Sequence, residues 1–143
     1  MKVYETGNIR NVVLLGHGGA GKTTIAEALA YVTSGINRMG SVDDGNTLSD
    51  FDKEEKKRKF SISTSVIPLE YKGESGELKI NVLDTPGYFD FVGEVEEAVS
   101  AADAAIIVVN GKAGIEPGTV RAWELCEANA LPRLFFVSNM DDD

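Results

Sequence analysis

The sequence has a single cysteine, a single histidine and no long hydrophobic run. Cys126 has no second cysteine with which to pair, which excludes a disulfide-stabilised scaffold and favours a reducing compartment, most simply the cytoplasm. No apolar stretch approaches the roughly 18 residues of a membrane-spanning helix. The N-terminal residues, Met-Lys-Val-Tyr-Glu-Thr-Gly-Asn, lack the apolar core of a signal peptide. We therefore expect a cytoplasmic protein that does not act at a membrane.

Basic residues are also scarce, with 14 lysines and arginines against 23 acidic residues and a net charge of -9. Proteins that wrap nucleic acid neutralise its phosphates with lysine and arginine, so we expect no direct wrapping of nucleic acid by this chain. The charge still allows contact with a nucleoprotein particle through another face or another domain. With 143 residues, of which 43% are hydrophobic and 26% charged, the chain has the size and composition of about one globular domain.

Short apolar runs predict the strands of a sheet, at 8–15, 60–71, 78–83, 104–109 and 134–137. Apolar residues at helical spacing predict helices between them, at 21–34, 92–102 and 118–130. The polar segment 40–59 predicts a solvated loop or a weak helix. Pro68 suits an edge strand, and the turn residues at 73–76 predict an antiparallel hairpin. This order of elements predicts an α/β fold with a mostly parallel sheet and helices on both faces.

The segment from Gly16 to Thr23 reads Gly-His-Gly-Gly-Ala-Gly-Lys-Thr and fits the phosphate-loop pattern G-x-x-x-x-G-K-[ST]. It lies between an expected strand and an expected amphipathic helix, which is the context that the pattern requires. Glycines let backbone N–H groups approach phosphate oxygens closely, and the helix N-terminus adds a partial positive charge. Lys22 can reach the β- and γ-phosphates, and the hydroxyl of Thr23 can bind Mg²⁺. The pattern therefore predicts a site for a nucleoside triphosphate.

A second motif, Asp84-Thr85-Pro86-Gly87, follows the apolar run at 80–83. A carboxylate at such a strand end can hold Mg²⁺. The N–H group of Gly87 can contact a γ-phosphate, which makes the following segment sensitive to the presence of that phosphate. Together with the phosphate loop, this motif predicts a nucleotide-dependent switch.

These motifs, with Pro-Arg-Leu-Phe-Phe-Val-Ser-Asn-Met-Asp at 132–141, make the chain resemble a translational GTPase over essentially its whole length. It is most similar to the elongation factor G branch, especially the divergent elongation factor G-like bacterial proteins. The most specific match is Asp-Thr-Pro-Gly-Tyr-Phe-Asp-Phe, from Asp84 to Phe91. The resemblance implies the fold of a P-loop NTPase (GTPase) domain, with GTP or GDP and Mg²⁺ as cofactors. It also implies the ribosome as a partner through the full-length protein.

The sequence stops at Asp141-Asp142-Asp143, directly after an expected strand, where a parallel sheet places its ligand contacts. We therefore expect residues 1–143 to be the N-terminal part of a translation-factor-type GTPase domain, C-terminally incomplete and a fragment of a longer protein. The other interpretation is a complete small domain with a short acidic tail. If further elements are missing, the strand at 134–137 lacks a neighbour, and we expect its apolar edge to allow self-association.

The resemblance assigns residues to the parts of the site. Those implied to bind the nucleotide are Gly16, His17, Gly18, Gly19, Ala20, Gly21, Lys22, Thr23, Thr24, Asp84, Gly87, Ser138, Asn139 and Asp141. Those implied to hold Mg²⁺ are Thr23, Ser61 and Asp84. Ser61 lies near the end of the family's first switch, where the family has a metal-binding threonine; serine keeps the hydroxyl, and the alternative is a solvent-facing strand residue. Lys59 stands where the family has a glycine.

Lys22 and Tyr88 are the implied catalytic residues, and Tyr88 departs from the family pattern. It follows Gly87 in the second switch, at the place of the histidine that orients the attacking water. A phenol can hydrogen-bond a water molecule, but its pKa of about 10 does not match the chemistry of histidine near neutral pH. Hydrolysis is therefore expected to be slow, dependent on a partner, or lost. We do not expect His17 to substitute, because it lies within the phosphate loop.

The segment Ser138-Asn139-Met140-Asp141 stands where the family has Asn-Lys-x-Asp. The resemblance implies that Asp141 accepts hydrogen bonds from N1–H and the exocyclic amine of guanine, which favours guanine over adenine. Ser138 replaces the asparagine with a shorter reach, and Asn139 replaces the lysine whose stem covers the base. In an alternative register Asn139 takes the role of the asparagine, but Asp141 then falls one residue short. We expect a guanine preference with reduced affinity.

The leading hypothesis is GTP binding and Mg²⁺-dependent GTP hydrolysis by an elongation factor G-like translation factor at the ribosome. One alternative is a GTP-dependent binding switch with weak or no hydrolysis, which Tyr88 allows. Another is a ribosomal protection-type factor, whose GTPase domain is similar. Outside the motifs we expect a tryptophan and a cysteine in the core and an exposed acidic helix face: Trp123, Cys126, Glu94, Glu96 and Glu97.

Overall fold

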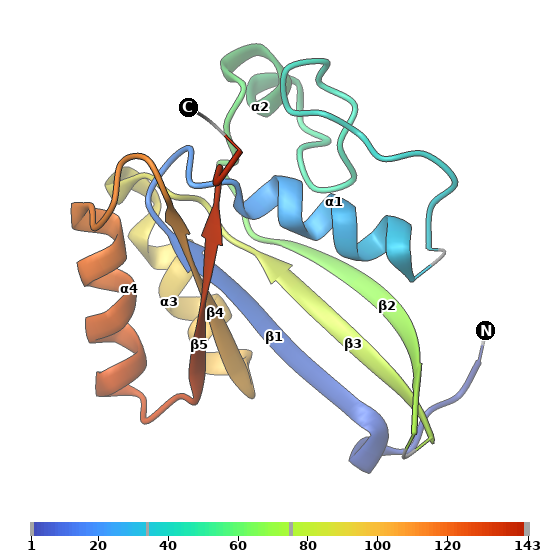
Figure 1. The fold of residues 1–143 in the computed structure, drawn as a ribbon. Helices are drawn as coiled ribbons and strands as arrows, with labels where there is room; N and C mark the ends of the chain where they lie inside the picture. The colour runs from blue at the N-terminus through green and yellow to red at the C-terminus, as the bar shows by residue number, and fades with distance from the viewer. Residues whose placement is uncertain (1, 34, 75, 142–143) are drawn as a thin grey trace.

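The apolar runs of the sequence become the strands of one sheet, and the amphipathic segments become helices that pack on it (Figure 1). The computed structural model describes residues 2–33, 35–74 and 76–141. The strands are β1 (Ile9–Gly16), β2 (Ser65–Gly73), β3 (Gly76–Asp84), β4 (Ala104–Asn110) and β5 (Arg133–Ser138). The helices are α1 (Lys22–Val32), α2 (Lys53–Arg58), α3 (Val92–Ala101) and α4 (Pro117–Ala128), with short 3-10 turns η1 (Thr6–Asn8) and η2 (Phe89–Phe91).

The strands of the described residues lie in the order β2-β3-β1-β4-β5, and every neighbouring pair is parallel except the β2–β3 hairpin. The mostly parallel α/β sheet that the sequence predicts is therefore confirmed. β2 is an edge strand, as Pro68 indicates. β1 lies at the centre, where Val12 pairs with Val82 of β3 and Ala104 of β4. Because helices cover both faces of this strand, its run from Val13 to Leu15 is apolar without alternation and almost wholly buried.

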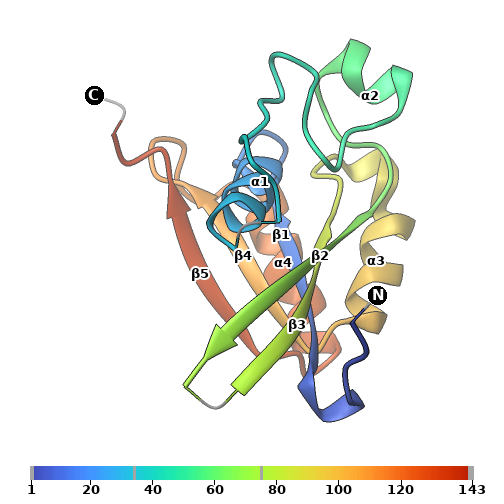
Figure 2. The ribbon, with the colours of Figure 1, turned by 90° about the vertical axis from the view of Figure 1, so that its right-hand side faces the viewer.

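Helix α1 covers one face of the sheet, and α3 and α4 cover the other (Figures 1 and 2). The apolar layer under α3 and α4 contains Val13, Leu15, Ile107, Ala98, Val99, Ala122 and Cys126. The layer under α1 contains Leu14, Ile67, Leu69, Val82, Ala26 and Ala30. Successive residues of β1 thus feed opposite layers, as the alternation of side chains along a strand requires. The expected burial of Cys126 is confirmed.

The strand predicted at 60–71 begins later than the sequence suggests, at Ser65. The reason lies in the hydrogen bonds of the preceding residues. The N–H groups of Ile62 and Ser63 donate to the side chain of Glu55 and not to a neighbouring strand. Because their backbone donors are already satisfied by a carboxylate, these residues lie outside the ladder of β2.

The polar segment 40–59 contains a short helix, α2, where the sequence predicts a loop or a weak helix. A capping box between Asp52 and Glu55 fixes its start. The side chain of Asp52 accepts a hydrogen bond from the backbone N–H group of Glu55, and the side chain of Glu55 accepts one from the backbone N–H group of Asp52. The predicted turn at 73–76 includes Ser75, which lies outside the described residues.

The prediction that Trp123 lies in the core is wrong, because its side chain is 42% exposed. Helix α4 places it over the outer strand of the sheet, where its ring stacks on Phe135 with centroids 5.9 Å apart. The guanidinium of Arg133 lies 3.8 Å from the centroid of the same ring. An aromatic and cation–π cluster therefore stands at the surface where the sequence predicts a core residue.

β5 is the free edge of the sheet beside β4, and its apolar residues are exposed on both faces. The residues from Leu134 to Val137 are between 45% and 55% exposed. The exposed apolar edge expected from the sequence is thus present. Among the described residues, no helix is long and apolar enough to cross a membrane.

We expect this chain to self-associate through β5 and the double substitution Leu134→Lys with Phe136→Lys to prevent association. Charged side chains on an edge strand oppose pairing with a second copy. Sedimentation velocity over a range of concentrations measures the effect. Val66→Lys is the matched control, because Val66 is also exposed (60%) but lies on the opposite edge strand, β2. A wild-type chain that stays monomeric at every concentration would contradict this expectation.

Candidate nucleotide-binding site

The phosphate loop connects the end of β1 to the start of α1, and its glycines adopt backbone angles that other residues rarely reach. Gly16 has φ 141° and Gly21, at the N-cap of α1, has φ 96°. No described side chain caps α1, so the first N–H groups of this helix are left for another acceptor. A helix N-terminus of this kind favours a bound anion. The expected strand–loop–helix context is therefore present.

Lys22 holds the loop together from inside. Its Nζ donates to the carbonyl oxygens of Gly16 at 3.1 Å and His17 at 2.9 Å. The side chain is 6% exposed, and burial lowers the pKa of Lys22 to about 8, against the attraction of Asp84. The only partners within hydrogen-bond distance in the described residues are neutral carbonyl oxygens, so an incoming phosphate would be the stronger acceptor.

Three oxygen-bearing side chains that the sequence predicts as metal ligands meet at the start of α1. The hydroxyl of Thr23 donates to Oδ2 of Asp84 at 2.8 Å and lies 3.3 Å from the hydroxyl of Ser61. Ser61 thus lies beside Thr23 and precedes β2, so the alternative of a solvent-facing strand residue is wrong. Its hydroxyl also donates to Asp50 at 2.7 Å. Sequence reasoning missed Asp50, because it lies in a segment dense with charged residues and only the folded loop turns it inward, to 3% exposure.

Asp84 is fully buried, with no exposed side-chain surface. Burial raises the pKa of Asp84 to about 6, although the Thr23 hydrogen bond and the charge of Lys22 oppose this rise. The hydroxyl of Ser49 lies nearby and also lowers the pKa of Asp84, although it forms no hydrogen bond of normal geometry with the carboxylate. Oδ1 of Asp84 and Oγ of Ser49 are therefore both buried and without a partner among the described residues. A carboxylate oxygen with no donor, beside hydroxyl oxygens, is a donor set that suits Mg²⁺.

Three glutamates hold the segment 40–64, in which the sequence predicts the first switch. Glu27 of α1 accepts hydrogen bonds from the N–H groups of Gly40 and Leu48, and its side chain is 1% exposed. Glu55 of α2 accepts from residues 62 and 63, as described above. Glu94 of α3 accepts from the N–H group of Thr64 at 2.7 Å. The expected exposed position of Glu94 is therefore wrong: its carboxylate is turned toward the first switch and is partly buried.

The second switch lies against the phosphate loop. A Cβ atom added at Gly87 would lie 2.5 Å from Nζ of Lys22 and 2.6 Å from the backbone nitrogen of Gly18, so only glycine fits here. The ring of Tyr88 packs over Gly18 and lies 4.7 Å from the ring of Phe60, measured between centroids. These residues line a cavity of about 200 Å³, together with Thr23, Thr24, Asp50 and Ser61.

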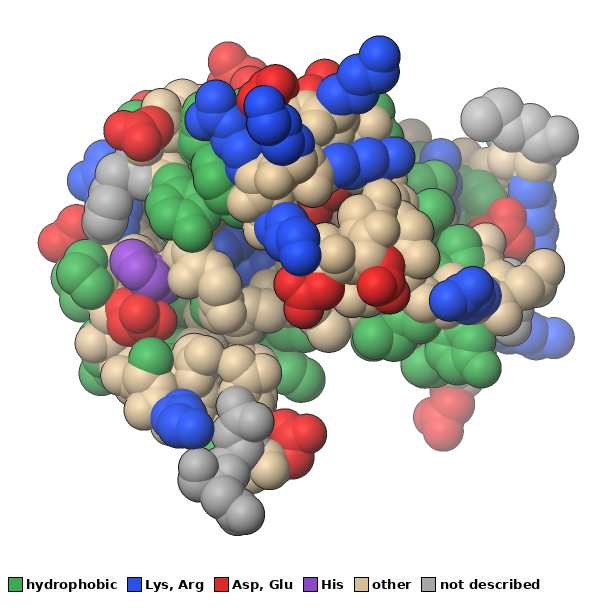
Figure 3. Space-filling view, turned by 90° about the horizontal axis from the view of Figure 1, so that it is seen from above, with side chains coloured by type: hydrophobic (Ala, Val, Ile, Leu, Met, Phe, Trp, Pro, Cys, Tyr) green, Lys and Arg blue, Asp and Glu red, His purple; other side chains and the backbone are tan. Residues whose placement is uncertain are grey.

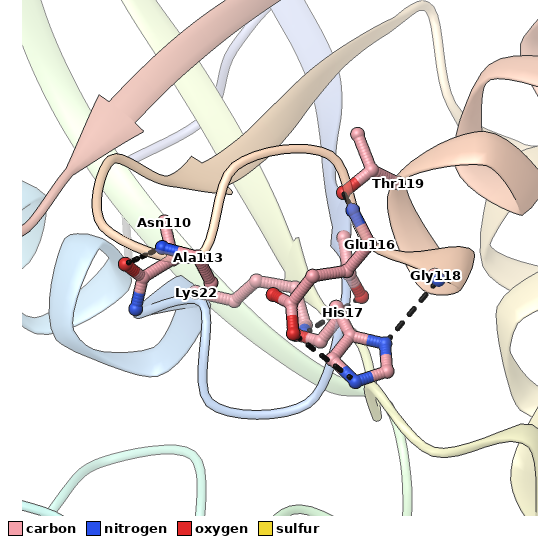
Figure 4. Close-up of polar contacts among 8 residues, drawn as sticks. His17, Lys22, Asn110, Ala113, Glu116, Gly118 and Thr119 are labelled. Atoms are coloured by element: carbon pink, nitrogen blue, oxygen red, sulfur yellow. Dashed lines mark hydrogen bonds and ion pairs between the residues drawn. The ribbon is translucent and has the colours of Figure 1, made fainter.

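His17 turns its side chain to α4 (Figure 4). Its Nδ1 accepts a hydrogen bond from the N–H group of Gly118 at 3.2 Å, and its Nε2 lies 3.6 Å from a carboxylate oxygen of Glu116. The imidazole is thus engaged with the start of α4.

Ser138 ties the end of β5 to the phosphate loop. Its hydroxyl donates to the carbonyl oxygens of Ala20 at 2.7 Å and Val109 at 3.3 Å. Asn139 follows with φ 52°, a left-handed conformation that turns the chain sharply. Asp141 is exposed, and no contact with another predicted site residue is described for it. The structure therefore brings Ser138 to the phosphate loop, whereas Asp141 lies at the surface. Residues 142–143 lie outside the described residues.

Comparisons with known proteins show what the chain as a whole is similar to. A family model described as the elongation factor Tu GTP binding domain matches residues 7–143. The chain is 40% identical over 135 residues to the mitochondrial ribosome-releasing factor 2 of Anopheles gambiae and, over the same length, to an elongation factor G-like protein of Mycobacterium tuberculosis. Each match covers 94% of this chain and 18% of the relative, so the chain spans about a fifth of their length.

Solved structures show the same fold. A crystal structure of a Thermus thermophilus protein matches with a TM-score of 0.89 and 44% identity, over 94% of this chain and 20% of that chain. A bacterial selenocysteine-specific elongation factor matches with a TM-score of 0.71 and 23% identity, over 94% of this chain and 20% of that chain. The second likeness concerns the fold alone.

Asp84→Asn should stabilise the nucleotide-free protein at pH 7 by at most about 3 kcal/mol. In the folded protein the pKa of Asp84 is about 6, above its usual value of 3.8. Between these two pH values the folded protein therefore binds a proton that the unfolded chain has released. The stability that this group contributes is present below pH 4 and is lost as the pH rises through about 6. The amide keeps an acceptor for Thr23 and offers a donor to Ser49.

Urea denaturation of both proteins between pH 4 and pH 8 measures this effect. The gain should be small near pH 4 and should grow through pH 6. Asp44→Asn is the control, because Asp44 is exposed and should change little at any pH. A destabilised Asp84→Asn variant at pH 7 would show that the buried carboxylate supports the apo fold.

Proposed function

The chain belongs to the family of elongation factor Tu GTP-binding domains, and we propose that it is the part of an elongation factor G-like translation factor that binds and hydrolyses GTP at the ribosome. The relatives named as an elongation factor G-like protein and as a ribosome-releasing factor support the translational role. The contact with the ribosome is proposed for the full-length protein. A reducing compartment, most simply the cytoplasm, suits the buried thiol of Cys126.

One observation carries this proposal: residues from three distant motifs meet at one point below the phosphate loop. Thr23 follows the loop, Ser61 ends the first switch and Asp84 starts the second, and the oxygens of Asp84 and Ser61 lie 2.8 Å and 3.3 Å from the Thr23 hydroxyl. A structural turn with an incidental lysine does not require this convergence. A switch that reads a nucleotide does require it, because both mobile segments must reach the same phosphate.

The donor set of this cluster would hold Mg²⁺ through the hydroxyls of Thr23 and Ser61 and the carboxylate of Asp84. The unpartnered Oδ1 of Asp84 supports this assignment. A bound magnesium ion neutralises charge on the transferred phosphoryl group. Asp50 would position Ser61 through the 2.7 Å hydrogen bond between their side chains.

The phosphates would lie on the loop itself. Backbone N–H groups of the loop and the first turn of α1 would bind phosphate oxygens, and Lys22 would exchange its carbonyl partners for the β- and γ-phosphates. The N–H group of Gly87 would contact the γ-phosphate, because Gly87 already lies against Gly18 and Lys22. The state of the second switch would then depend on that phosphate.

The guanine preference would rest on Asp141 and on the path of the chain before it. Ser138 positions this segment by its hydrogen bond to Ala20. Asn139, with its left-handed backbone conformation, turns the chain between Ser138 and Asp141. Asp141 would accept hydrogen bonds from guanine there, and adenine lacks the matching donors.

Gly87→Ala should weaken the binding of a GTP analogue by about tenfold or more and change GDP binding much less. The added methyl would force Gly87 away from Lys22 and Gly18, which removes its hydrogen bond to the γ-phosphate. Titration of fluorescent nucleotides measures both affinities. Gly93→Ala in α3 is the control, because nothing lies within 4 Å of a Cβ added there. Equal losses for both nucleotides would argue against a specific γ-phosphate contact.

Tyr88→His should raise ribosome-stimulated GTP hydrolysis by about 100-fold or more, because a histidine accepts a proton near neutral pH and a phenol does not. Single-turnover hydrolysis by the full-length protein, with and without ribosomes, measures this change. The control is Tyr71→His on β2, a similarly exposed tyrosine away from the cavity.

The same experiment separates hydrolysis from a binding switch. If ribosomes do not raise the wild-type rate and the histidine variant gains strongly, the protein is a GTP-dependent binding switch, which Tyr88 at the mouth of the cavity favours. If the wild-type protein is already fast and the substitution changes nothing, Tyr88 does not limit the reaction.

A further inference from the structure

Glu94 differs from the other acidic side chains of α3 in where its carboxylate points. Glu96 and Glu97 are exposed. Acidic and basic side chains also lie together at the surface of the end of the molecule that carries α2 (Figure 3). The carboxylate of Glu94 is turned instead toward the first switch and is partly buried. An acidic residue in the first turn of a helix stabilises the helix dipole, so its contacts decide whether it has a further role.

Two hydrogen bonds join Glu94 to Thr64, which lies 30 positions earlier in the chain. The N–H group of Thr64 donates to Oε2 of Glu94 at 2.7 Å, and the hydroxyl of Thr64 donates to the carbonyl oxygen of Glu94 at 3.1 Å. The ladder between β2 and β3 begins one residue later, with Ser65 opposite Asp84. The carboxylate of Glu94 therefore satisfies a backbone donor that lies just outside the sheet.

A second contact between the same two parts of the chain lies on the other side of Ser61. The ring of Phe60 packs against the ring of Tyr88, with centroids 4.7 Å apart. Ser61 thus lies between two residues, Phe60 and Thr64, that each contact the second switch or the helix after it. Apolar contacts are non-directional, whereas a hydrogen bond to a carboxylate is short and directional. Of the two contacts, the one to Glu94 is therefore better able to fix a position.

Glu94 also connects the two places where the proposed site meets the nucleotide. On one side, Thr64 leads back along the chain to Ser61, whose hydroxyl lies 3.3 Å from that of Thr23. On the other side, α3 and η2 lead back from Glu94 to Gly87, which lies against the phosphate loop. If either segment moves, it must break the hydrogen bonds of Thr64 or carry the other segment with it.

We propose that Glu94 is a positioning residue, which holds Thr64 and thereby keeps Ser61 at the metal cluster while the second switch lies on the phosphate loop. The inference rests on the proposed function, because it concerns how the GTP site is assembled. The hydroxyl of Ser61 and the N–H group of Gly87 would then reach the metal ion and the γ-phosphate as one unit. Loss of the γ-phosphate would free Gly87 and, through Glu94, release Ser61.

The test compares Glu94→Ala with the wild type in the full-length protein, without ribosomes. Affinity for a fluorescent, non-hydrolysable GTP analogue in the presence of Mg²⁺ should fall about tenfold, because a hydrogen bond to a charged acceptor is lost. Affinity for GDP should change by less than about twofold, because GDP lacks the phosphate that would hold Gly87. Glu97→Ala is the matched control, since Glu97 is exposed on the same helix, and it should bind both nucleotides as the wild type does.

Glu94→Gln separates the hydrogen bond from the charge. Its amide oxygen can still accept from the N–H group of Thr64, so this variant should recover most of the affinity that Glu94→Ala loses, although a neutral acceptor is weaker than a carboxylate. A residue that acts only through the helix dipole would behave differently, because the amide has no charge. In that case the glutamine variant would be as weak as the alanine variant.

Hydrogen exchange of the analogue-bound protein gives a readout besides affinity. In Glu94→Ala, peptides that cover residues 60–64 and 85–91 should both exchange faster than in the wild type. Faster exchange in only one of these segments would overturn the inference and leave the proposed function standing. So would equal losses of affinity for both nucleotides, or a glutamine variant as weak as the alanine variant. A wild-type protein that does not bind the GTP analogue would overturn both.

Discussion

The buried carboxylate of Asp84 is the group on which the geometry of the site depends. Parallel pairing of β1 with β3 sets Asp84 opposite Leu14, and the hydroxyl of Thr85 donates to the Leu14 carbonyl at 2.6 Å, which fixes the chain as it leaves the strand. Thr23, in the first turn of α1, then reaches Asp84 at 2.8 Å. Because burial disfavours the charged carboxylate, the fold holds a group that is better satisfied by a cation than by the protein. The register of the sheet thus places the carboxylate of Asp84 beside the hydroxyl of Thr23.

The segment between α1 and β2 is organised by side chains and not by a backbone ladder. Glu27, Glu55 and Glu94 come from three helices, and each accepts hydrogen bonds from the backbone of this segment. Because the carboxylates of Glu27 and Glu55 are buried, their backbone partners hold this segment in place, and removal of those partners would leave buried charges unpaired. Glu94 follows the second switch in the chain and binds Thr64 at the end of the first. Hydrogen bonds between Thr64 and Glu94 therefore join the two expected switch segments directly.

The parts that the sequence predicts correctly are those that local patterns determine. The glycine-rich loop lies between an apolar run and an amphipathic helix, and neither needs distant residues to be recognised. The roles of Asp50 and Glu94 were missed because a carboxylate in a polar segment or on a helix gives no local sign that the fold will turn it inward. The prediction that Trp123 lies in the core is wrong for a similar reason. Its exposure depends on what covers α4 and β5, and the sequence pattern of its own helix does not indicate this. Ser61 could be predicted only through the family pattern.

Net charge does not report how charge is distributed in this protein, because four of its carboxylates are buried. Glu27 and Glu55 are almost wholly buried as acceptors for backbone N–H groups, and Asp50 and Asp84 lie inside the candidate metal cluster. The same hydrogen bonds that bury Glu55 turn the opposite face of α2, with its lysines, to solvent. Acidity in the sequence and a positive surface at the first switch are therefore two consequences of one arrangement, in which acidic side chains organise a segment that has little regular secondary structure.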